Sequence, residues 1–173
     1  MGNRPPEAGI RVPPSVLRDF VQKLFVGAGM RDEDAQTMAD LLVATDLRGV
    51  VSHGTHQTQG YMRMLLQGRV NPRPEIQVLS SRGATRVYDG DGGMGHLPSS
   101  QAARFVAEAA QEHGLAAATT GNHFHFGGAG KYSRFAADAG RIGIAVSSHR
   151  WQRQGPILSA ATGASPMSVA FPS

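Results

Sequence analysis

The first part of the chain carries apolar residues at helical spacing in three successive segments. The first segment begins after Pro13, the second begins after Asp32, and the third covers residues 54–66. Each repeats apolar side chains every three or four positions. Glycines stand where each segment should end. The side chains expected to face inward are Val16, Leu17, Phe20, Val21, Leu24 and Phe25 in the first helix, Ala35, Met38, Leu41, Leu42 and Ala44 in the second, and Tyr61, Met62, Leu65 and Leu66 in the third.

Beyond residue 74 the pattern changes to short strands that alternate with helices. The expected strands cover residues 76–79, 85–88, 115–120, 142–148 and 167–171, and the expected helices cover residues 97–113 and 131–139. This alternation predicts an α/β architecture with a mainly parallel sheet. Ligands of such sheets lie at the carboxyl ends of the strands. The loops expected there cover residues 89–96, 121–128 and 147–155.

Composition narrows the possible functions. Of 173 residues, 40% are hydrophobic and 17% are charged, which is typical of a globular protein. The absence of cysteine excludes disulfides, zinc–thiolate sites and thiol nucleophiles, and it favours a reducing cytoplasm. The formal charge is +4, but the arginines are scattered, so no nucleic-acid surface is predicted. No apolar run reaches the roughly 18–20 residues of a membrane helix.

Ser52-His53-Gly54 stands where the third helix should begin. Ser52 can cap that helix by accepting hydrogen bonds from the amides near Thr55. His53 would then lie in the first turn, where the helix dipole lowers the pKa of an imidazole. A neutral imidazole can take a proton from an alcohol near pH 7. The alternative is an ordinary serine cap followed by a surface histidine.

Two histidine pairs raise the question of a metal site. His53 and His56 are three residues apart and would share a helix face, and His123 and His125 would point the same way in a strand. Four imidazoles could bind zinc. Because no carboxylate is placed near either pair, the sequence predicts no metal ligands.

Two glycine-rich loops have binding and structural interpretations. Residues 90–95 match G-x-G-x-x-G between a strand and a helix, but no acidic residue ends the next strand as a dinucleotide fingerprint requires. A tight turn is the alternative. The residues from His125 to Gly130 lead into a helix whose first amides could hold a phosphate or carboxylate. The alternative there is a close-packed turn.

Several runs together identify a family resemblance. DLRGVVSHGTHQTQGYMRMLLQGRVNPRP, DGDGGMGHLPSSQAARFVAEAAQEHGLA, HFGGAGKYSRFAADAGRIGIAVS and GASPMSVAFP resemble, in order and spacing, the type 2 malate/L-lactate dehydrogenase family. The resemblance covers nearly all of residues 14–172. It implies NADH or NADPH bound without a Rossmann domain, a 2-hydroxy or 2-keto acid as substrate, and a homodimer. The expected division is a flexible arm (1–11), a helical domain (12–75) and the N-terminal part of an α/β cofactor-binding domain (76–173).

The resemblance also implies roles for individual residues. His53 matches the proposed acid/base that serves the substrate hydroxyl or ketone, and Ser52 matches a substrate contact beside it. The residues that match the cofactor's surroundings are His125, Gly127, Gly128, Ala129, Gly130, Ser165 and Pro166.

Two departures from the family bear on function. Members usually carry an arginine five residues after the serine, where it pairs with the substrate carboxylate, and here that residue is Gln57. Arg63 is a possible substitute among the substrate-binding residues. The chain is also much shorter than family members, so strand edges and apolar helix faces are expected to be exposed. The alternative function is an inactive fragment, or one subunit, that acts through protein–protein association with a missing C-terminal half.

Overall fold

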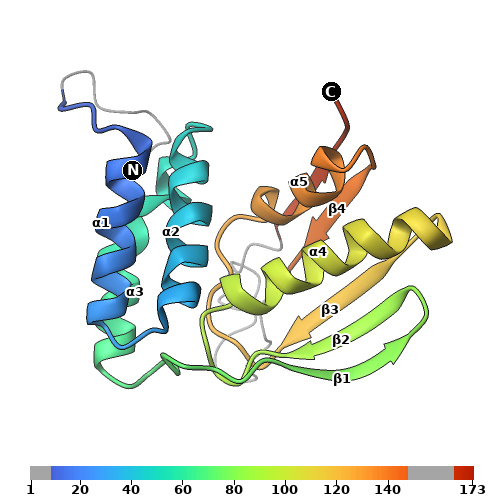
Figure 1. Cartoon of the computed structure of the whole chain (residues 1–173), viewed down its shortest axis with the longest axis horizontal. Helices are drawn as coiled ribbons and strands as arrows, with labels where there is room; N and C mark the ends of the chain where they lie inside the picture. Colours follow the sequence, from blue (N-terminus) through green and yellow to red (C-terminus); the bar gives the residue numbers. More distant parts are fainter. Residues whose placement is uncertain (1–8, 148–165) are drawn as a thin grey trace, which may run out of the picture.

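A computed structural model describes residues 9–147 and 166–173 of the chain. One end of the molecule is helical, and Figure 1 shows its three helices side by side. These are α1 (Pro14–Gly27), α2 (Asp32–Asp46) and α3 (Thr58–Leu66), with the short 3-10 turns η1 (Val51–His53) and η2 (Thr55–Gln57) before α3. Pro14 occupies the first turn of α1, where a missing amide hydrogen costs nothing.

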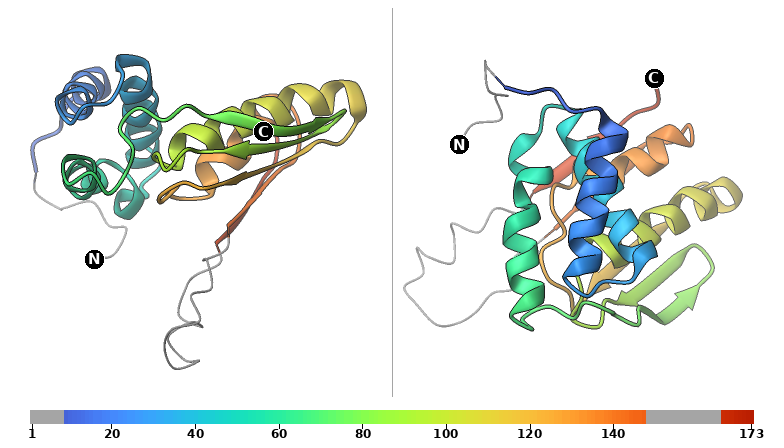
Figure 2. Two further views of the ribbon diagram at one scale, coloured as in Figure 1. Left: turned by 90° about the horizontal axis from the view of Figure 1, so that it is seen from below. Right: turned by 60° about the vertical axis from the view of Figure 1, so that its left-hand side comes forward.

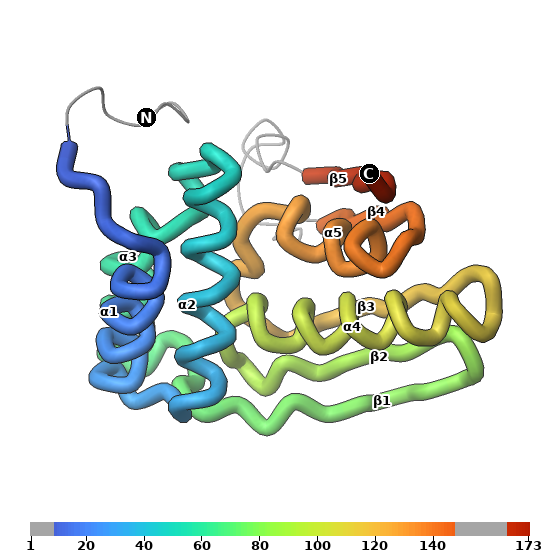
Figure 3. The backbone as a smooth tube through the Cα atoms, turned by 45° about the horizontal axis from the view of Figure 1, so that its top comes forward, coloured from blue at the N-terminus to red at the C-terminus, as the bar shows by residue number. Residues whose placement is uncertain are grey.

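The rest of the described chain is an α/β arrangement. Its elements are β1 (Gln77–Arg82), β2 (Thr85–Asp89), α4 (His96–His113), β3 (Ala117–Gly121), α5 (Gly130–Asp138), β4 (Gly143–Val146) and β5 (Met167–Ala170). Helix α4 packs against β2 and β3, and α5 packs against α4, β4 and β5. Figure 3 shows α5 between α4 and the β4–β5 pair. The α/β class expected from the sequence is confirmed.

The sheet is less parallel than the alternation predicts. β1, β2 and β3 form one sheet in which only the β2–β3 pair, joined through α4, is parallel. β4 does not extend this sheet but pairs antiparallel with β5. The expectation of a mainly parallel sheet was therefore wrong, because the hairpin turn at Gly83 pairs β1 with β2 locally and β4 finds its partner in β5.

The buried core joins the helical end to the α/β part. Phe25, Met38 and Leu42 are fully buried between the helices, and Met94 and Leu97, at the start of α4, belong to the same cluster. Val70, in the segment between α3 and β1, packs into the same cluster. This continuous core fixes the helical segment against the loops that follow β2 and β3. The domain boundary at residue 75 remains a prediction.

Four expected inward positions are wrong. On α1, Val16 is 55% exposed and Phe20 is 59% exposed. Leu66 is 66% exposed and Ala44 is exposed, whereas Val43 and Thr45 are buried. Leu66 is the last residue of α3, so no further turn covers it. On α2 the buried stripe includes Ala39, Val43 and Thr45, because α4 contacts this helix in addition to α1.

Much of the strand surface is uncovered. Every residue of β1 is exposed, and large apolar side chains on β4 and β5 face outward, among them Ile144, Val146, Met167 and Val169. Figure 2 shows α4 lying along one side of the β1–β3 sheet. The predicted exposure of strand edges and apolar helix faces is seen in the described residues, in the edge strand β1 and in Phe20 of α1. Within residues 9–147 and 166–173, no helix has the length and apolar character needed to cross a bilayer.

Candidate active site

The carboxyl ends of β2 and β3 bring two predicted loops together. Because these strands are parallel, the loop after Asp89 and the loop after Gly121 leave the same edge of the sheet. The Gly92 amide donates to the Asn122 carbonyl at 2.8 Å, and the Phe124 amide donates to the Gly93 carbonyl at 2.8 Å. The third predicted loop, residues 147–155, lies almost wholly outside the described residues. The first two loops bring His96, His123 and His125 to this edge of the sheet.

His53 lies at the end of a 3-10 turn rather than inside an α-helix. The α-helix begins only at Thr58, so both the expected start at Gly54 and the Ser52 cap were wrong. The Thr55 amide donates instead to the Asp46 carboxylate, at 3.1 Å to Oδ2. A side chain on Gly54 would overlap that carboxylate, since an added Cβ would stand 1.7 Å from Asp46 Oδ1. A carboxylate cap from α2 therefore holds the turn.

His53 is half-buried; its ring contacts the neighbouring Ser52, and its backbone carbonyl contacts an ammonium group. Ser52 Oγ lies 2.9 Å from His53 Nδ1, and Lys131 Nζ donates to the His53 carbonyl oxygen at 2.7 Å. Burial lowers the pKa of His53 below its usual 6.5, and the Lys131 charge lowers it further. The direction of this pKa shift is the one expected from the sequence, but its causes are burial and a neighbouring cation rather than a helix dipole.

His125 faces His53 across the site. The two ring centroids are 6.1 Å apart and the rings are tilted by 41°. Tyr61, from the buried face of α3, places its hydroxyl 2.8 Å from His125 Nδ1, and burial raises the pKa of that hydroxyl. Tyr61 was predicted only as a core residue. Its helical spacing shows burial and gives no sign of a partner in a loop far along the chain.

The turn from Gly127 to Gly130 runs beside these rings. A Cβ added to Gly128 would stand 3.6 Å from His53 Cβ, so the absence of a side chain leaves space next to the imidazole. The amides of Lys131 and Tyr132 already donate to the Gly128 and Ala129 carbonyls. The expected free amides for a phosphate are therefore not available from these two residues.

His96 lies beneath the same turn and was not predicted as a site residue. Its ring is completely buried, in edge-to-face contact with Tyr61 at 5.4 Å between centroids. Neither ring nitrogen has a hydrogen-bond partner of ordinary geometry among the described residues. Burial, Lys131 and His125 lower the pKa of His96 well below its usual value. A Cβ on Gly127, whose φ is +81°, would stand 2.7 Å from His96 Nε2, so only glycine fits there.

The G-x-G-x-x-G loop is a packed turn. Added Cβ atoms would stand 2.7 Å from His123 Cβ at Gly90, 2.5 Å from Pro74 Cγ at Gly93, and 2.4 Å from the Phe124 carbonyl at Gly95. The opening residues of α4 are buried as well. These glycines allow the protein to pack on itself, which supports the tight-turn interpretation.

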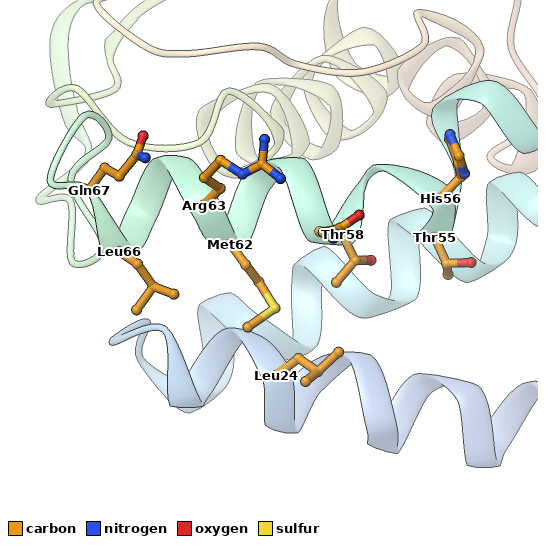
Figure 4. Close-up of a pocket in the computed structure, with 9 residues that line it drawn as sticks. Leu24, Thr55, His56, Thr58, Met62, Arg63, Leu66 and Gln67 are labelled. Carbon is orange, nitrogen blue, oxygen red and sulfur yellow. The ribbon is translucent and has the colours of Figure 1, made fainter.

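Gln57 and Arg63 make contacts other than those expected of substrate-binding residues. Gln57 Nε2 donates to the Ser52 carbonyl at 2.7 Å, so its amide stabilises the turn. Arg63 and His56 line an open groove of about 700 Å³ between α1 and α3, together with Leu24, Thr55, Thr58, Gln59, Met62, Leu66 and Gln67. Figure 4 shows this groove, whose lining includes neither His53 nor His125. His56 thus lines this groove, whereas His53 does not.

The remaining predicted positions are only partly described. Ser165 lies outside the described residues. Pro166 accepts a hydrogen bond from the Ser147 amide at 3.1 Å and so extends the β4–β5 pair. Two residues further on, Ser168 Oγ lies 2.9 Å from Ser133 Oγ on α5. Within the described ranges, no group of three or more histidines, aspartates and glutamates is arranged to hold a metal ion.

Comparisons with known proteins show the family to which the chain belongs. The model of the malate/L-lactate dehydrogenase family matches residues 12–173. Malate dehydrogenase of Pyrococcus horikoshii is 35% identical over 141 residues, which are 82% of this chain and 39% of the relative. Ureidoglycolate dehydrogenase (NAD(+)) of Escherichia coli is 26% identical over 137 residues, 79% of this chain and 39% of the relative.

The solved structures show the same fold over nearly the whole chain. The structure of the Pyrococcus horikoshii malate dehydrogenase superposes with a TM-score of 0.80 at 29% identity, over 95% of this chain and 47% of that one. The chain spans about two fifths of the length of the relatives it matches in sequence. By its sequence and its fold, the chain belongs to the malate/L-lactate dehydrogenase family of oxidoreductases.

Proposed function

We propose that the site formed by His53, His125 and the Gly127–Gly130 turn transfers hydride between NAD or NADP and a 2-hydroxy acid or its 2-keto acid. The observation that carries this proposal is the approach of the two imidazoles, 6.1 Å apart, beside a turn without side chains. Membership of the dehydrogenase family supports the reaction class. One relative carries NAD(+) in its name, which supports the cofactor class.

His53 is the acid/base in this proposal. Its lowered pKa keeps the ring neutral near pH 7, so it accepts the proton of the substrate hydroxyl during oxidation and returns it during reduction. Ser52 Oγ, 2.9 Å from Nδ1, can accept the Nδ1 hydrogen, and that tautomer places the proton-accepting lone pair on Nε2. The Ser52 hydroxyl thus orients the ring, and in the proposal it also contacts the substrate.

His125 and the glycine turn fit the reactive end of a nicotinamide. Gly128 leaves space within van der Waals reach of His53, and Tyr61 fixes the orientation of His125 through Nδ1. The nicotinamide, when bound, supplies or accepts the hydride. Gly127, Ala129 and Gly130 would hold the cofactor together with Gly128, and Ser165 and Pro166 are assigned to the same site from the family pattern.

The uncovered strands indicate where the active protein is completed. Ile144, Val146 and Phe171 are each more than 60% exposed, and stable domains rarely leave such apolar groups in water. In the proposal, a C-terminal half covers this surface in a homodimeric enzyme, in keeping with relatives of more than twice this length. The cytoplasm is the compartment proposed, consistent with the lack of cysteine. Pure association without catalysis would explain the exposed strands but gives no reason for the approach of His53 and His125.

The test is a titration of the 173-residue chain with NADH and NADPH, followed through the reduced nicotinamide fluorescence. Saturable binding of either cofactor, weakened by His125→Ala and not by His113→Ala at the exposed end of α4, is expected. If neither cofactor binds up to millimolar concentration, the chain by itself is not a dehydrogenase, and the association function is favoured.

A further inference from the structure

The site contains a buried positive charge that the proposed mechanism does not use. Lys131, in the first turn of α5, is 3% exposed. Its ammonium donates to the His53 carbonyl oxygen, and no carboxylate of the described residues lies within salt-bridge distance of it. An ammonium has three hydrogens to donate. A buried charge without a counter-ion is costly, so such a group commonly marks a place where an anion binds.

The charges around Lys131 add to its demand for an anion. Just after α2, Arg48 donates to the Gly130 carbonyl at 3.0 Å, and its Nε is buried without a partner among the described residues. Asp46 is the acid whose charge acts on Lys131 and raises its pKa, but the Asp46 carboxylate is occupied with the Thr55 amide and hydroxyl. His96 on α4 contributes a neutral ring. Burial and Arg48 together lower the pKa of Lys131 to about 8.

The residue expected to neutralise a substrate carboxylate is used elsewhere. The Gln57 amide donates to the Ser52 carbonyl, and an amide carries no charge in any case. Arg63 lines the groove between α1 and α3, which does not include His53. Of the cations in the described residues, Lys131 is the one in direct contact with His53.

We propose that the Lys131 ammonium, supported by Arg48, binds the carboxylate of the 2-hydroxy or 2-keto acid beside His53. This inference rests on the proposed function and assigns its substrate charge to a residue that the sequence motif does not mark. The attraction is strong because the ammonium is buried, where charges are weakly screened. Lys131 therefore determines specificity for acids over uncharged ketones or alcohols.

The test uses the fact that the chain has only two lysines, Lys23 and Lys131. Lys23 is on the exposed face of α1, so in Lys23→Met a ¹³C label on lysine Cε reports on Lys131 alone. Oxalate, an unreactive analogue of a 2-keto acid, is added with and without saturating NADH, and the Lys131 signal is followed across pH. The expected result is a rise in the Lys131 pKa when oxalate binds, because a nearby anion favours the ammonium form.

A binding measurement by calorimetry complements the labelled spectra. Lys131→Met should weaken oxalate binding at least about tenfold, as truncating one partner of a buried charge pair does, whereas Lys23→Met should leave it unchanged. An unmoved Lys131 signal at saturating oxalate overturns the inference. So does a Lys131→Met variant that loses affinity for pyrophosphate instead, because the ammonium would then serve the cofactor.

The two proposals fail separately. If oxalate shifts the Lys131 signal but the chain oxidises no 2-hydroxy acid, the proposed reaction alone is refuted. A chain that oxidises a 2-hydroxy acid while the Lys131 signal ignores oxalate refutes the carboxylate assignment alone.

Discussion

The rings of His53 and His125 face each other with centroids 6.1 Å apart, although one follows α2 and the other follows β3. The shared core that joins the helical end to α4 produces this approach. In the proposed function, one of these imidazoles accepts the proton and the other positions the reactants.

Tyr61→Phe tests how His125 is positioned. The substitution removes the hydroxyl that lies 2.8 Å from His125 Nδ1. Since one hydrogen bond contributes about 1 kcal/mol, kcat should fall roughly three- to tenfold. The pH profile of kcat should also change, because the His125 ring loses its contact with the Tyr61 hydroxyl. Steady-state kinetics across pH measure both. Tyr88→Phe, on the buried face of β2, is the control; equal losses in the two variants would reduce Tyr61 to a packing role.

Gly127→Ala tests the turn beneath the cofactor. The new Cβ would stand 2.7 Å from His96 Nε2 and 3.2 Å from Lys131 Nζ at a residue with φ +81°. Such backbone strain costs on the order of 1–3 kcal/mol. The melting temperature should decrease, and NADH should bind about tenfold more weakly. Gly121→Ala, where a Cβ meets nothing within 4 Å, should change neither; normal NADH affinity in Gly127→Ala would remove the turn from the cofactor site.

Gly54→Ala tests the carboxylate cap that holds His53. A methyl group there overlaps the Asp46 carboxylate, so the turn must shift, and the free energy of unfolding should fall by about 1–3 kcal/mol. Urea denaturation measures this change. Gly60→Ala on the exposed side of α3 is the matched control, and it should stabilise the protein by up to about 1 kcal/mol because alanine favours helix. A Gly54→Ala protein as stable as the wild type would disprove the cap.

His96 predicts how stability depends on pH. Its folded pKa lies well below 6.5, so the unfolded chain binds more protons than the folded chain once the pH falls below about 6.5. The contribution of His96 to the free energy of unfolding is therefore fully present above that pH, and it decreases as the pH falls toward the folded pKa. His96→Gln should flatten this dependence, whereas His113→Gln at the exposed end of α4 should preserve it. A wild-type stability that is level between pH 7 and pH 5 contradicts the buried neutral ring.

The sequence predicted the elements better than it predicted the way they meet. Periodicity located each α-helix and strand of the described residues to within a few positions, because apolar spacing reflects which face of an element is buried. It misplaced the start of α3, since the cap comes from Asp46, an acid in the preceding helix. It also missed the pairing of β4 with β5, because pairing depends on partners rather than on local pattern.

In the candidate site, too, single residues were easier to predict than the contacts between them. His53 and His125 could be predicted because each belongs to a distinctive local run of residues. Tyr61, His96 and Lys131 could not, since their importance arises from contacts between α3, α4 and α5. A lysine at a helix N-terminus is the one available signal, because the helix dipole disfavours a cation there.

The most direct test of the account is the rate at which the chain, completed by the C-terminal half where that is needed, reduces a 2-keto acid with NADH or NADPH before and after His53→Ala. Loss of the acid/base should lower the rate by about 10²–10⁴-fold, and His56→Ala, three residues away on the exposed side, should leave it within about twofold of wild type. A His53→Ala protein that reduces its substrate at the wild-type rate would show that the proton is handled elsewhere.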